Sequence, residues 1–135
     1  MRPKLEAMVL CDAVFREPAS QKVFLLGLCN AVVARTLPAQ IPKLTVYVAL
    51  SGIRVRTVVD LAVVRLTQED SWERVGPVIH LTFEPQGGPL DLTDLDLVIT
   101  GLELPQYGEY RFGLTWEGEP LDSKRFQVIP MEGKE

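Results

Sequence analysis

Hydrophobic and polar positions alternate most cleanly near the C-terminus of the chain. From Tyr110 to Trp116 the even positions hold Tyr, Phe, Leu and Trp, whereas the odd positions hold Arg, Gly and Thr. A period of two is typical of a strand with one face in a core and the other face in water. The pattern therefore predicts a half-buried strand over Glu109–Glu117, with a second strand over Leu121–Ile129.

The register of this hairpin follows from which residues must share the core face. We expect Phe126 to lie opposite Tyr110, through a three-residue loop at 117–119 in which Gly118 or Glu119 is left-handed. Leu121 is an odd number of residues from Phe126, so on an unbroken strand it turns outward. The Tyr110 hydroxyl is expected to bond a backbone group within 104–107, as in a tyrosine corner.

Other extended segments are bounded by Gly, Pro or charged turn residues. They are Leu5–Phe15, Lys22–Thr36, Leu44–Ser51, Arg54–Gln68, Val78–Glu84 and Leu90–Leu102. The odd positions share a face in three of these segments: Leu5 to Ala13 in the first, Val55 to Val63 in the fourth, and Leu95 to Ile99 in the last. Turns or loops are expected at Glu17–Ser20, Leu37–Pro42, Glu69–Ser71 and Pro85–Pro89.

The nearly all-apolar segment Lys22–Thr36 is typical of a central strand that is covered on both sides, with a bulge or bend at Gly27. The alternative is a buried helix, which Gly27 and the valines disfavour. Regularly spaced strands without a convincing amphipathic helix predict an all-β fold. We expect a two-sheet antiparallel β-sandwich of about eight strands, formed as a single domain by residues 1–135.

Composition narrows the functional classes. The chain is 47% hydrophobic, so it can form a core without metals or disulfides, and its net charge of -4 argues against nucleic-acid binding. The longest apolar run, Val23 to Ala34, is too short to span a membrane, and Glu6 and Asp12 interrupt any signal-peptide h-region. We therefore expect a cytoplasmic protein with no membrane partner. Cys11 and Cys29 are expected to be free thiols, because a hairpin turning near Pro18 places Cys11 opposite Leu26.

Carboxylates provide the candidate chemistry. Asp91, Asp94 and Asp96 lie on or beside one strand and resemble a loop-clustered calcium site, but the leucines between them favour a solvated strand face. Asp12 and Asp60 stand within apolar strands, where each must point to solvent or find a partner such as Arg54, Arg56 or Arg65. A functional acid at either position is the alternative.

Other polar and aromatic residues also favour structural roles. His80 is expected to be a partly buried strand residue, and a Ser51–His80–Asp60 triad is disfavoured because Ser51 lacks a nucleophile elbow. Trp72, expected in a charged loop, is either a recognition residue or a lid over the sandwich edge. Gly87 and Gly88 form a turn and no phosphate-binding loop. We therefore predict no catalytic, cofactor-binding or metal-binding residue.

The C-terminal residues carry a resemblance. The run Leu102-Glu103-Leu104-Pro105, with Gly108, Tyr110, Phe112 and then Trp116-Glu117-Gly118-Glu119, resembles the final hairpin of an uncharacterised bacterial family of small β-sandwich proteins. Cys11-Asp12 and Pro38 are similar to that family's opening. The Leu-x-Pro-x-x-Gly-x-Tyr pattern is also similar to fibronectin-III-like domains, which implies an immunoglobulin/fibronectin-III-like sandwich. The family resemblance implies a bacterial protein of unknown function.

Three functional hypotheses follow. The first is a non-catalytic binding or assembly module with a protein partner. The second is a small structural subunit that self-associates through exposed strand edges, with a homodimer as the expected state. The third is a small hydrolase or metal-dependent enzyme that uses Asp12, Asp60 or the Asp91–Asp96 cluster. We favour the non-catalytic module, with no cofactor.

Overall fold

The computed structural model describes residues 2–86 and 91–132, and within these ranges it contains nine β-strands and no helix. The all-β prediction is therefore confirmed. The strands are β1 (Lys4–Arg16), β2 (Val23–Leu28), β3 (Ala31–Ala34), β4 (Ala39–Ser51), β5 (Thr57–Leu66), β6 (Trp72–Phe83), β7 (Leu92–Leu104), β8 (Gly108–Trp116) and β9 (Glu119–Pro130).

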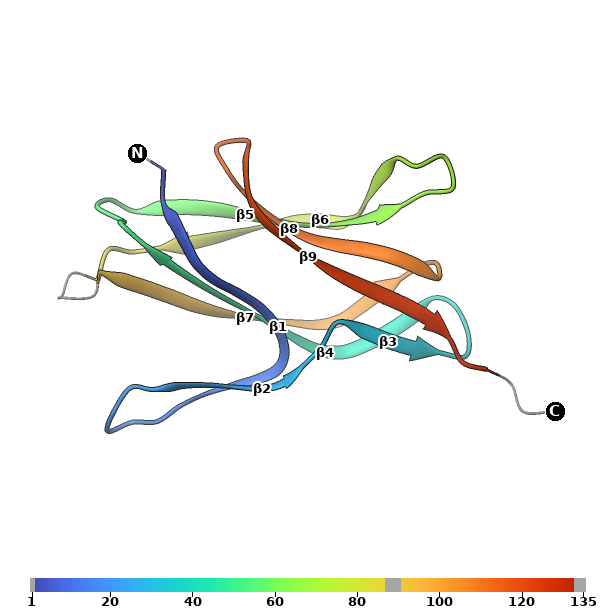
Figure 1. Ribbon diagram of the computed structural model, residues 1–135, viewed down its shortest axis with the longest axis horizontal. Coiled ribbons are helices and arrows are strands. Elements are labelled where there is room, and N and C mark those ends of the chain that lie inside the picture. Colours follow the sequence, from blue (N-terminus) through green and yellow to red (C-terminus); the bar gives the residue numbers. More distant parts are fainter. Residues whose placement is uncertain (1, 87–90, 133–135) are drawn as a thin grey trace.

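The strands form two sheets, which lie one above the other in Figure 1. Sheet A has the order β2-β1-β4-β7, and sheet B has the order β3-β9-β8-β5-β6. Neighbouring strands are antiparallel except β3 and β9, which pair in parallel from Ala31 with Gln127 to Ala34 with Pro130. Sheet B is therefore mixed, and the expectation of strictly antiparallel pairing is wrong at this edge.

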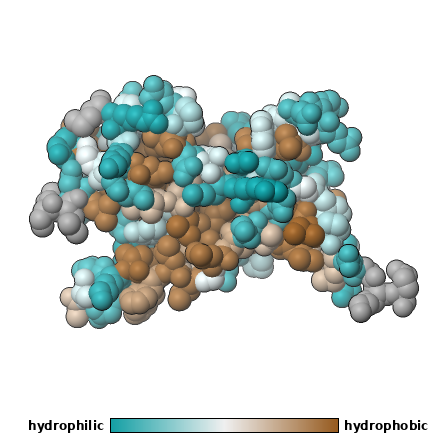
Figure 2. All heavy atoms as spheres, in the orientation of Figure 1, coloured by the Kyte–Doolittle hydropathy of each residue, from teal (hydrophilic) through white to brown (hydrophobic). Residues whose placement is uncertain are grey.

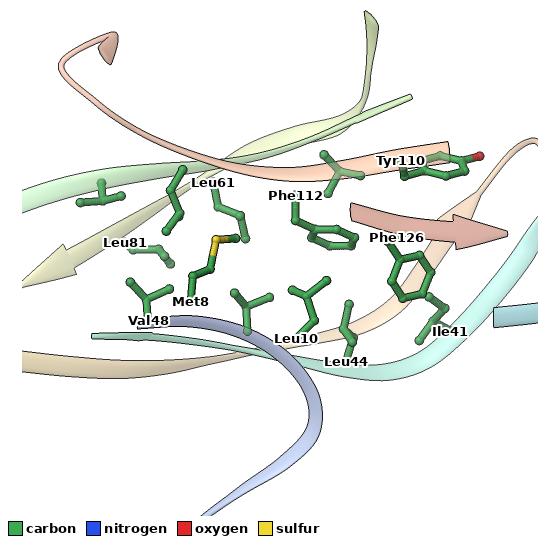
Figure 3. Packing of buried hydrophobic residues seen from close by; sticks show 14 of the residues in the cluster. Met8, Leu10, Ile41, Leu44, Val48, Leu61, Leu81, Tyr110, Phe112 and Phe126 are labelled. Atoms are coloured by element: carbon green, nitrogen blue, oxygen red, sulfur yellow. The ribbon is translucent and has the colours of Figure 1, made fainter. Parts of the chain in front are cut away.

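The core lies between the two sheets and takes its side chains from both (Figure 3). Sheet A contributes Val46 and Val48, and sheet B contributes Leu61, Phe112 and Phe126, all of them almost fully buried. The rings of Phe112 and Phe126 meet edge to face with their centroids 5.7 Å apart, an arrangement that aromatic pairs prefer.

The C-terminal hairpin has the predicted register. Tyr110 lies opposite Phe126, and both side chains are fully buried. The Tyr110 hydroxyl donates to the Gln106 carbonyl oxygen at 2.7 Å and accepts from the Gln106 amide at 2.9 Å. The predicted tyrosine-corner bond is therefore confirmed, and burial raises the pKa of Tyr110.

The loop of this hairpin is shorter than expected. Glu117 and Gly118 both have positive φ, and the strand pairs close directly on either side of them, so the turn has two residues and not three. A bulge at Leu121 supplies the missing residue, because the register shifts by one between Leu114 and Thr115. Leu121 packs against the core, so the prediction that it turns outward is wrong.

The apolar segment Lys22–Thr36 is not one central strand. It forms β2 at the edge of sheet A and β3 at the edge of sheet B, with the chain crossing between the sheets at residues 29–30. An edge strand has a neighbour on one side only, and many of its apolar side chains stay in contact with water: Leu28 is 75% exposed. The central-strand prediction is therefore wrong.

Two proline-containing stretches expected outside strands belong to long ones. Pro42 lies within β4, where β1 pairs only from Thr45 onward, so at Pro42 the strand has a neighbour, β7, on one side only. Proline within sheets is found at such edge positions. Pro77 lies within β6, beside a bulge and the positive-φ residue Gly76. Trp72 therefore begins a strand and is not part of a loop. The expected turn at 85–89 lies largely outside the described residues.

Candidate interaction surface

The hairpin formed by β1 and β2 extends beyond the body of sheet A (Figure 1). The ladder between β1 and β4 ends at Cys11, opposite Thr45, whereas the ladder between β1 and β2 continues to Arg16, opposite Val23. The outer part of the hairpin is thus a two-stranded ribbon. Isolated two-stranded ribbons are marginally stable in water, so further contacts are needed to hold it.

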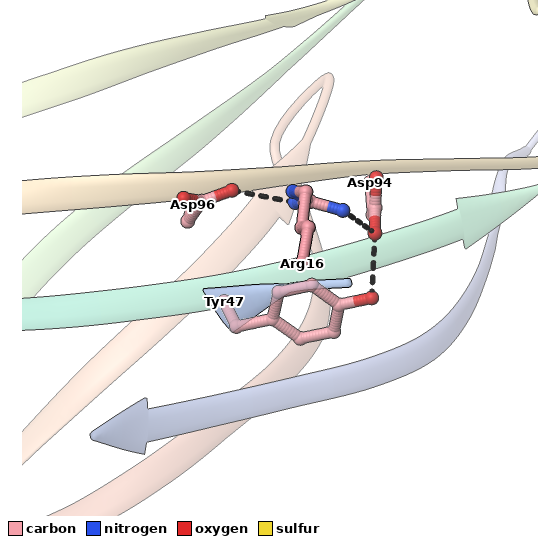
Figure 4. Close-up of polar contacts among 4 residues, drawn as sticks. All are labelled: Arg16, Tyr47, Asp94 and Asp96. Carbon is pink, nitrogen blue, oxygen red and sulfur yellow. Dashed lines mark hydrogen bonds and ion pairs between the residues drawn. The ribbon is translucent and has the colours of Figure 1, made fainter. Parts of the chain in front are cut away.

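Arg16, the last residue of β1, provides such a contact (Figure 4). Its Nη1 lies 2.8 Å from Asp94 Oδ2, and its Nη2 lies 2.6 Å from Asp96 Oδ1. The Tyr47 hydroxyl donates to the same Asp94 oxygen at 2.7 Å, and the guanidinium lies 6.0 Å from the centre of the Tyr47 ring. The hydrogen bonds to the two carboxylates are charge-assisted, and such bonds are stronger than those between neutral groups.

The contact joins strands that are not neighbours. Asp94 and Asp96 belong to β7, which β4 separates from β1 in the order of sheet A. The side chain of Arg16 must therefore reach across the outer face of β4, where it meets Tyr47. The two carboxylates raise the pKa of Arg16, and burial together with Asp94 raises the pKa of Tyr47. The cluster therefore holds the hairpin against the outer face of sheet A.

A bulge in β1 decides which residues of the hairpin face outward. Leu5 pairs with Leu50, but the register shifts by one before Met8 pairs with Val48. Leu5 and Met8 therefore both contact the core, and odd positions from Ala7 onward lie on the opposite face. The prediction that the odd positions from Leu5 to Ala13 share one face is wrong at Leu5.

Four large apolar side chains of the hairpin are exposed. Phe15 lies opposite Phe24 with the ring centroids 6.0 Å apart, and the flanking β2 positions hold Leu26 and Leu28. Their exposed fractions are 52% for Phe15, 46% for Phe24, 52% for Leu26 and 75% for Leu28. We call these four residues the hairpin face. Figure 2 shows hydrophobic residues gathered over the lower half of the molecule, where β2 and the end of β1 that pairs with it lie.

The hairpin face adjoins an open strand edge. β2 pairs with β1 on one side, and no other described strand pairs with its second side. No residue of Val23–Leu28 carries a charge. Aromatic side chains have areas of about 150–250 Å²; with a value near the lower part of this range for all four residues, their exposed fractions amount to roughly 400 Å². This is the size of the largest apolar patch on a typical monomer, and patches of that size are often functional.

Gly27 interrupts the apolar strand and lies against Asp12 of β1. It has a φ of 69°, and a Cβ atom at this position would overlap the Asp12 carboxylate. A residue with a side chain would therefore be both strained and crowded here. Asp12 itself is exposed, in agreement with the prediction that it either points to solvent or finds a partner. The bend expected at Gly27 thus places a carboxylate beside the base of β2.

The candidate acid Asp60 is bound by a histidine and lies apart from Ser51. Asp60 lies opposite His80 across β5 and β6, with 2.5 Å between Oδ1 and Nδ1. His80 is 68% exposed at its side chain, so the predictions of a partly buried His80 and an arginine partner for Asp60 are wrong. Ser51 lies in sheet A and donates to Glu6, so the three triad residues do not come together.

The three aspartates of the calcium-like cluster are divided between two arginines. Asp91 accepts from Arg54 at 2.6 Å and from the Gly52 amide at 3.1 Å, and these contacts, Arg54 first, lower its pKa. Asp94 and Asp96 share a face, as predicted, but they bind Arg16 where a solvated face was expected. Within residues 2–86 and 91–132, no group of three or more His, Cys, Asp or Glu residues is arranged to hold a metal.

The two cysteines are free, as expected. Cys11 is buried and lies opposite Leu28, whereas the predicted partner was Leu26. Cys29, which follows Leu28 in the sequence, is half-buried. Burial raises the pKa of both thiols. Near Cys29, a groove of about 310 Å³ at the base of β2 is also lined by Leu28, Lys124 and Arg125. The groove extends the hairpin face toward sheet B.

Trp72 lies at the start of β6 and is 47% exposed. The guanidinium of Arg111 lies 6.0 Å from the centre of its ring, a cation–π distance. Trp72 therefore packs along sheet B. No described segment of the chain forms a helix that could cross a membrane.

Together, these features define an all-β protein of two sheets with a projecting hairpin. The sequence matches the family of unknown function DUF6941 over residues 6–129, and the chain belongs to that family. The predicted membership of an uncharacterised family is thereby confirmed. No curated protein matches the chain. Among solved structures, an immunoglobulin-like protein from Pseudomonas aeruginosa is 17% identical, with 95% of this chain and 97% of that chain covered and a TM-score of 0.47.

Proposed function

We propose that the protein is a non-catalytic binding or assembly module and that the hairpin face is its interaction surface. The observation that carries the proposal is the grouping of Phe15, Phe24, Leu26 and Leu28 on a hairpin with an unpaired strand edge. Exposed apolar patches of this kind mark protein interaction sites.

The size of the hairpin face supports binding. Removing roughly 400 Å² of apolar surface from water is worth about 10 kcal/mol at 25 cal/mol per Å². The loss of translational and rotational freedom on association offsets a large part of this favourable free energy. The Arg16 contacts hold the hairpin in place before a partner arrives, which lowers the ordering cost of binding.

Contacts of the acidic residues favour the non-catalytic role over a hydrolase or metal-dependent enzyme. Asp91 is bound by Arg54, and Asp60 is bound by His80. Asp94 is bound by Arg16 and Tyr47. A general acid or base needs a carboxyl group that is available to substrate, whereas these three are bound by other side chains of the chain.

The proposal includes the finer expectations from the sequence. We infer a single domain of immunoglobulin/fibronectin-III-like type, and the Tyr110–Gln106 hydrogen bonds support the likeness to fibronectin-III domains. We also infer a bacterial protein, which the family resemblance implies, and a cytoplasmic location, for which the free thiols Cys11 and Cys29 are supporting observations.

Site-specific photo-crosslinking tests the proposed surface. A photoreactive amino acid replaces Phe24 on the hairpin face, and in a matched control it replaces Val55, which is 70% exposed away from the hairpin. After irradiation in cells, we expect a discrete protein adduct at position 24 and none at position 55. A second substitution, Leu28→Glu, should abolish the adduct at position 24. Absence of an adduct at 24, or equal adducts at both positions, would overturn the proposal.

A further inference from the structure

We propose that the occupant of the hairpin face is a second copy of this chain, bound with its β2 edge antiparallel to the first. This inference rests on the proposed function and specifies the partner. Pairing of the two edges about a two-fold axis joins two four-stranded sheets into one continuous sheet. The contact is isologous, because the same surface is used on both copies.

The edges of the two sheets differ in how well they are protected against pairing. The edge strand β6 carries Pro77 and a bulge, and the edge strand β7 carries Asp94 and Asp96. The edge strand β3 has only 4 residues. Charge, proline, bulges and short length are the devices by which proteins prevent edge-to-edge association.

β2 lacks two of these devices, charge and proline. Its six residues, Val23–Leu28, include no proline and no charged side chain. Its side chains are apolar on both faces, so a paired strand would remove apolar surface from water as well as complete the backbone hydrogen bonds. Among the described edges, β2 is therefore the one suited to pairing.

The antiparallel orientation follows from the symmetry of the contact. The two copies present the same backbone N–H and C=O groups to each other, and strands related by a two-fold axis exchange donors and acceptors only when they run in opposite directions. A two-fold axis near Leu25 meets this condition and places Lys22 of each copy opposite Leu28 of the other.

The apolar side chains are compatible with the same axis. A two-fold axis at Leu25 places Phe24 of one copy opposite Leu26 of the other, and the reverse contact forms by symmetry. Each hairpin face contributes roughly 400 Å², about half of the 800 Å² per partner in a standard interface. We therefore expect a dimer of modest affinity, with a dissociation constant on the order of micromolar.

Sedimentation velocity over about 1 to 200 µM protein tests the dimer, because this range brackets a micromolar dissociation constant. The wild type should shift from monomer to dimer. Leu26→Glu should weaken the dimer on the order of 100-fold, whereas the control Val33→Glu on the β3 edge should leave it unchanged. Circular dichroism checks that each variant folds, which is expected because Leu26 and Val33 are both about half exposed.

Two results would overturn the inference: a monomeric wild type at the highest concentration, or a dimer broken by Val33→Glu and not by Leu26→Glu. A monomer that still forms a crosslink from position 24 to a different protein would refute the second copy while leaving the proposed function in place. A dimer with no crosslink at position 24 would refute both.

Discussion

Arg16 binds Asp94 with 2.8 Å between Nη1 and Oδ2, although 78 residues separate them in sequence and β4 lies between their strands. The contact closes the outer part of the β1–β2 hairpin against sheet A. Because the hairpin face lies on this ribbon, one ion-pair cluster determines how the exposed apolar residues are presented.

Removing the Arg16 side chain should loosen the hairpin without unfolding the protein. Arg16→Ala should lower the free energy of unfolding by about 1 kcal/mol, because the pairs are partly exposed and solvent weakens them. Amide hydrogen exchange should accelerate mainly in residues 12–26. Arg54→Ala, which removes the Arg54–Asp91 pair, is the matched control and should leave exchange in the hairpin unchanged. Equal acceleration in both variants would contradict the role given to Arg16.

Alkaline pH should destabilise the protein through its buried tyrosines. Burial, followed by Asp94, raises the pKa of Tyr47, and burial raises the pKa of Tyr110. An unfolded tyrosine has a pKa near 10, so both groups contribute stability fully below about pH 10 and lose it as the pH rises toward the folded values. Denaturant titrations at about pH 8 and 11 should show this loss, and a smaller one for Tyr47→Phe. Identical pH dependence in the two proteins would contradict the assignment to Tyr47.

The aromatic core should respond far more strongly than the hairpin face to truncation. Phe112 is fully buried, so Phe112→Ala should cost roughly 3–5 kcal/mol of unfolding free energy. Tyr110→Phe removes a buried hydrogen bond and should cost about 1 kcal/mol. Phe24→Ala, at a half-exposed position, should cost much less than Phe112→Ala under monomeric conditions. Denaturant titration measures all three, and a Phe24 effect equal to that of Phe112 would refute the division between core and surface.

Calcium should leave the thermal stability unchanged. Asp94 and Asp96 are bound by Arg16, and Asp91 by Arg54, so the three carboxylates do not converge. A specific site filled at about 100 times its dissociation constant would add about 2.7 kcal/mol. Differential scanning calorimetry with and without millimolar calcium measures the effect. A rise of several degrees that Asp94→Asn abolishes would show a calcium site.

The alternation of apolar and polar residues correctly predicted the register of the C-terminal hairpin formed by β8 and β9. The pairing of Tyr110 with Phe126 followed from a period of two, since burying one face fixes the register. The bulge at Leu121 was not visible, because the same register results whether the extra residue lies in the turn or in the strand. Leu5 and Met8 show the same limit in β1, where a bulge reverses the face without changing the residue types.

The sequence did not indicate the candidate surface, because the residues of that surface have the composition of a buried strand. The run containing Phe24, Leu26 and Leu28 has the pattern of a buried central strand. Apolar content alone does not distinguish a covered strand from an exposed edge strand. The absence of protective charges from this run was its informative signal. No sequence pattern near Arg16 indicated its ion pairs, because its partners Asp94 and Asp96 are brought close only by the tertiary fold.

Concentration-dependent amide hydrogen exchange tests most directly whether β2 is the edge through which the protein associates. We expect the amides of residues 24–28 to exchange more slowly at about 200 µM than at about 1 µM, on either side of a micromolar dissociation constant. The amides of β7, at the opposite edge of sheet A, should exchange equally at both concentrations. Unchanged exchange in β2, or slowing in β7 instead, would contradict association through β2.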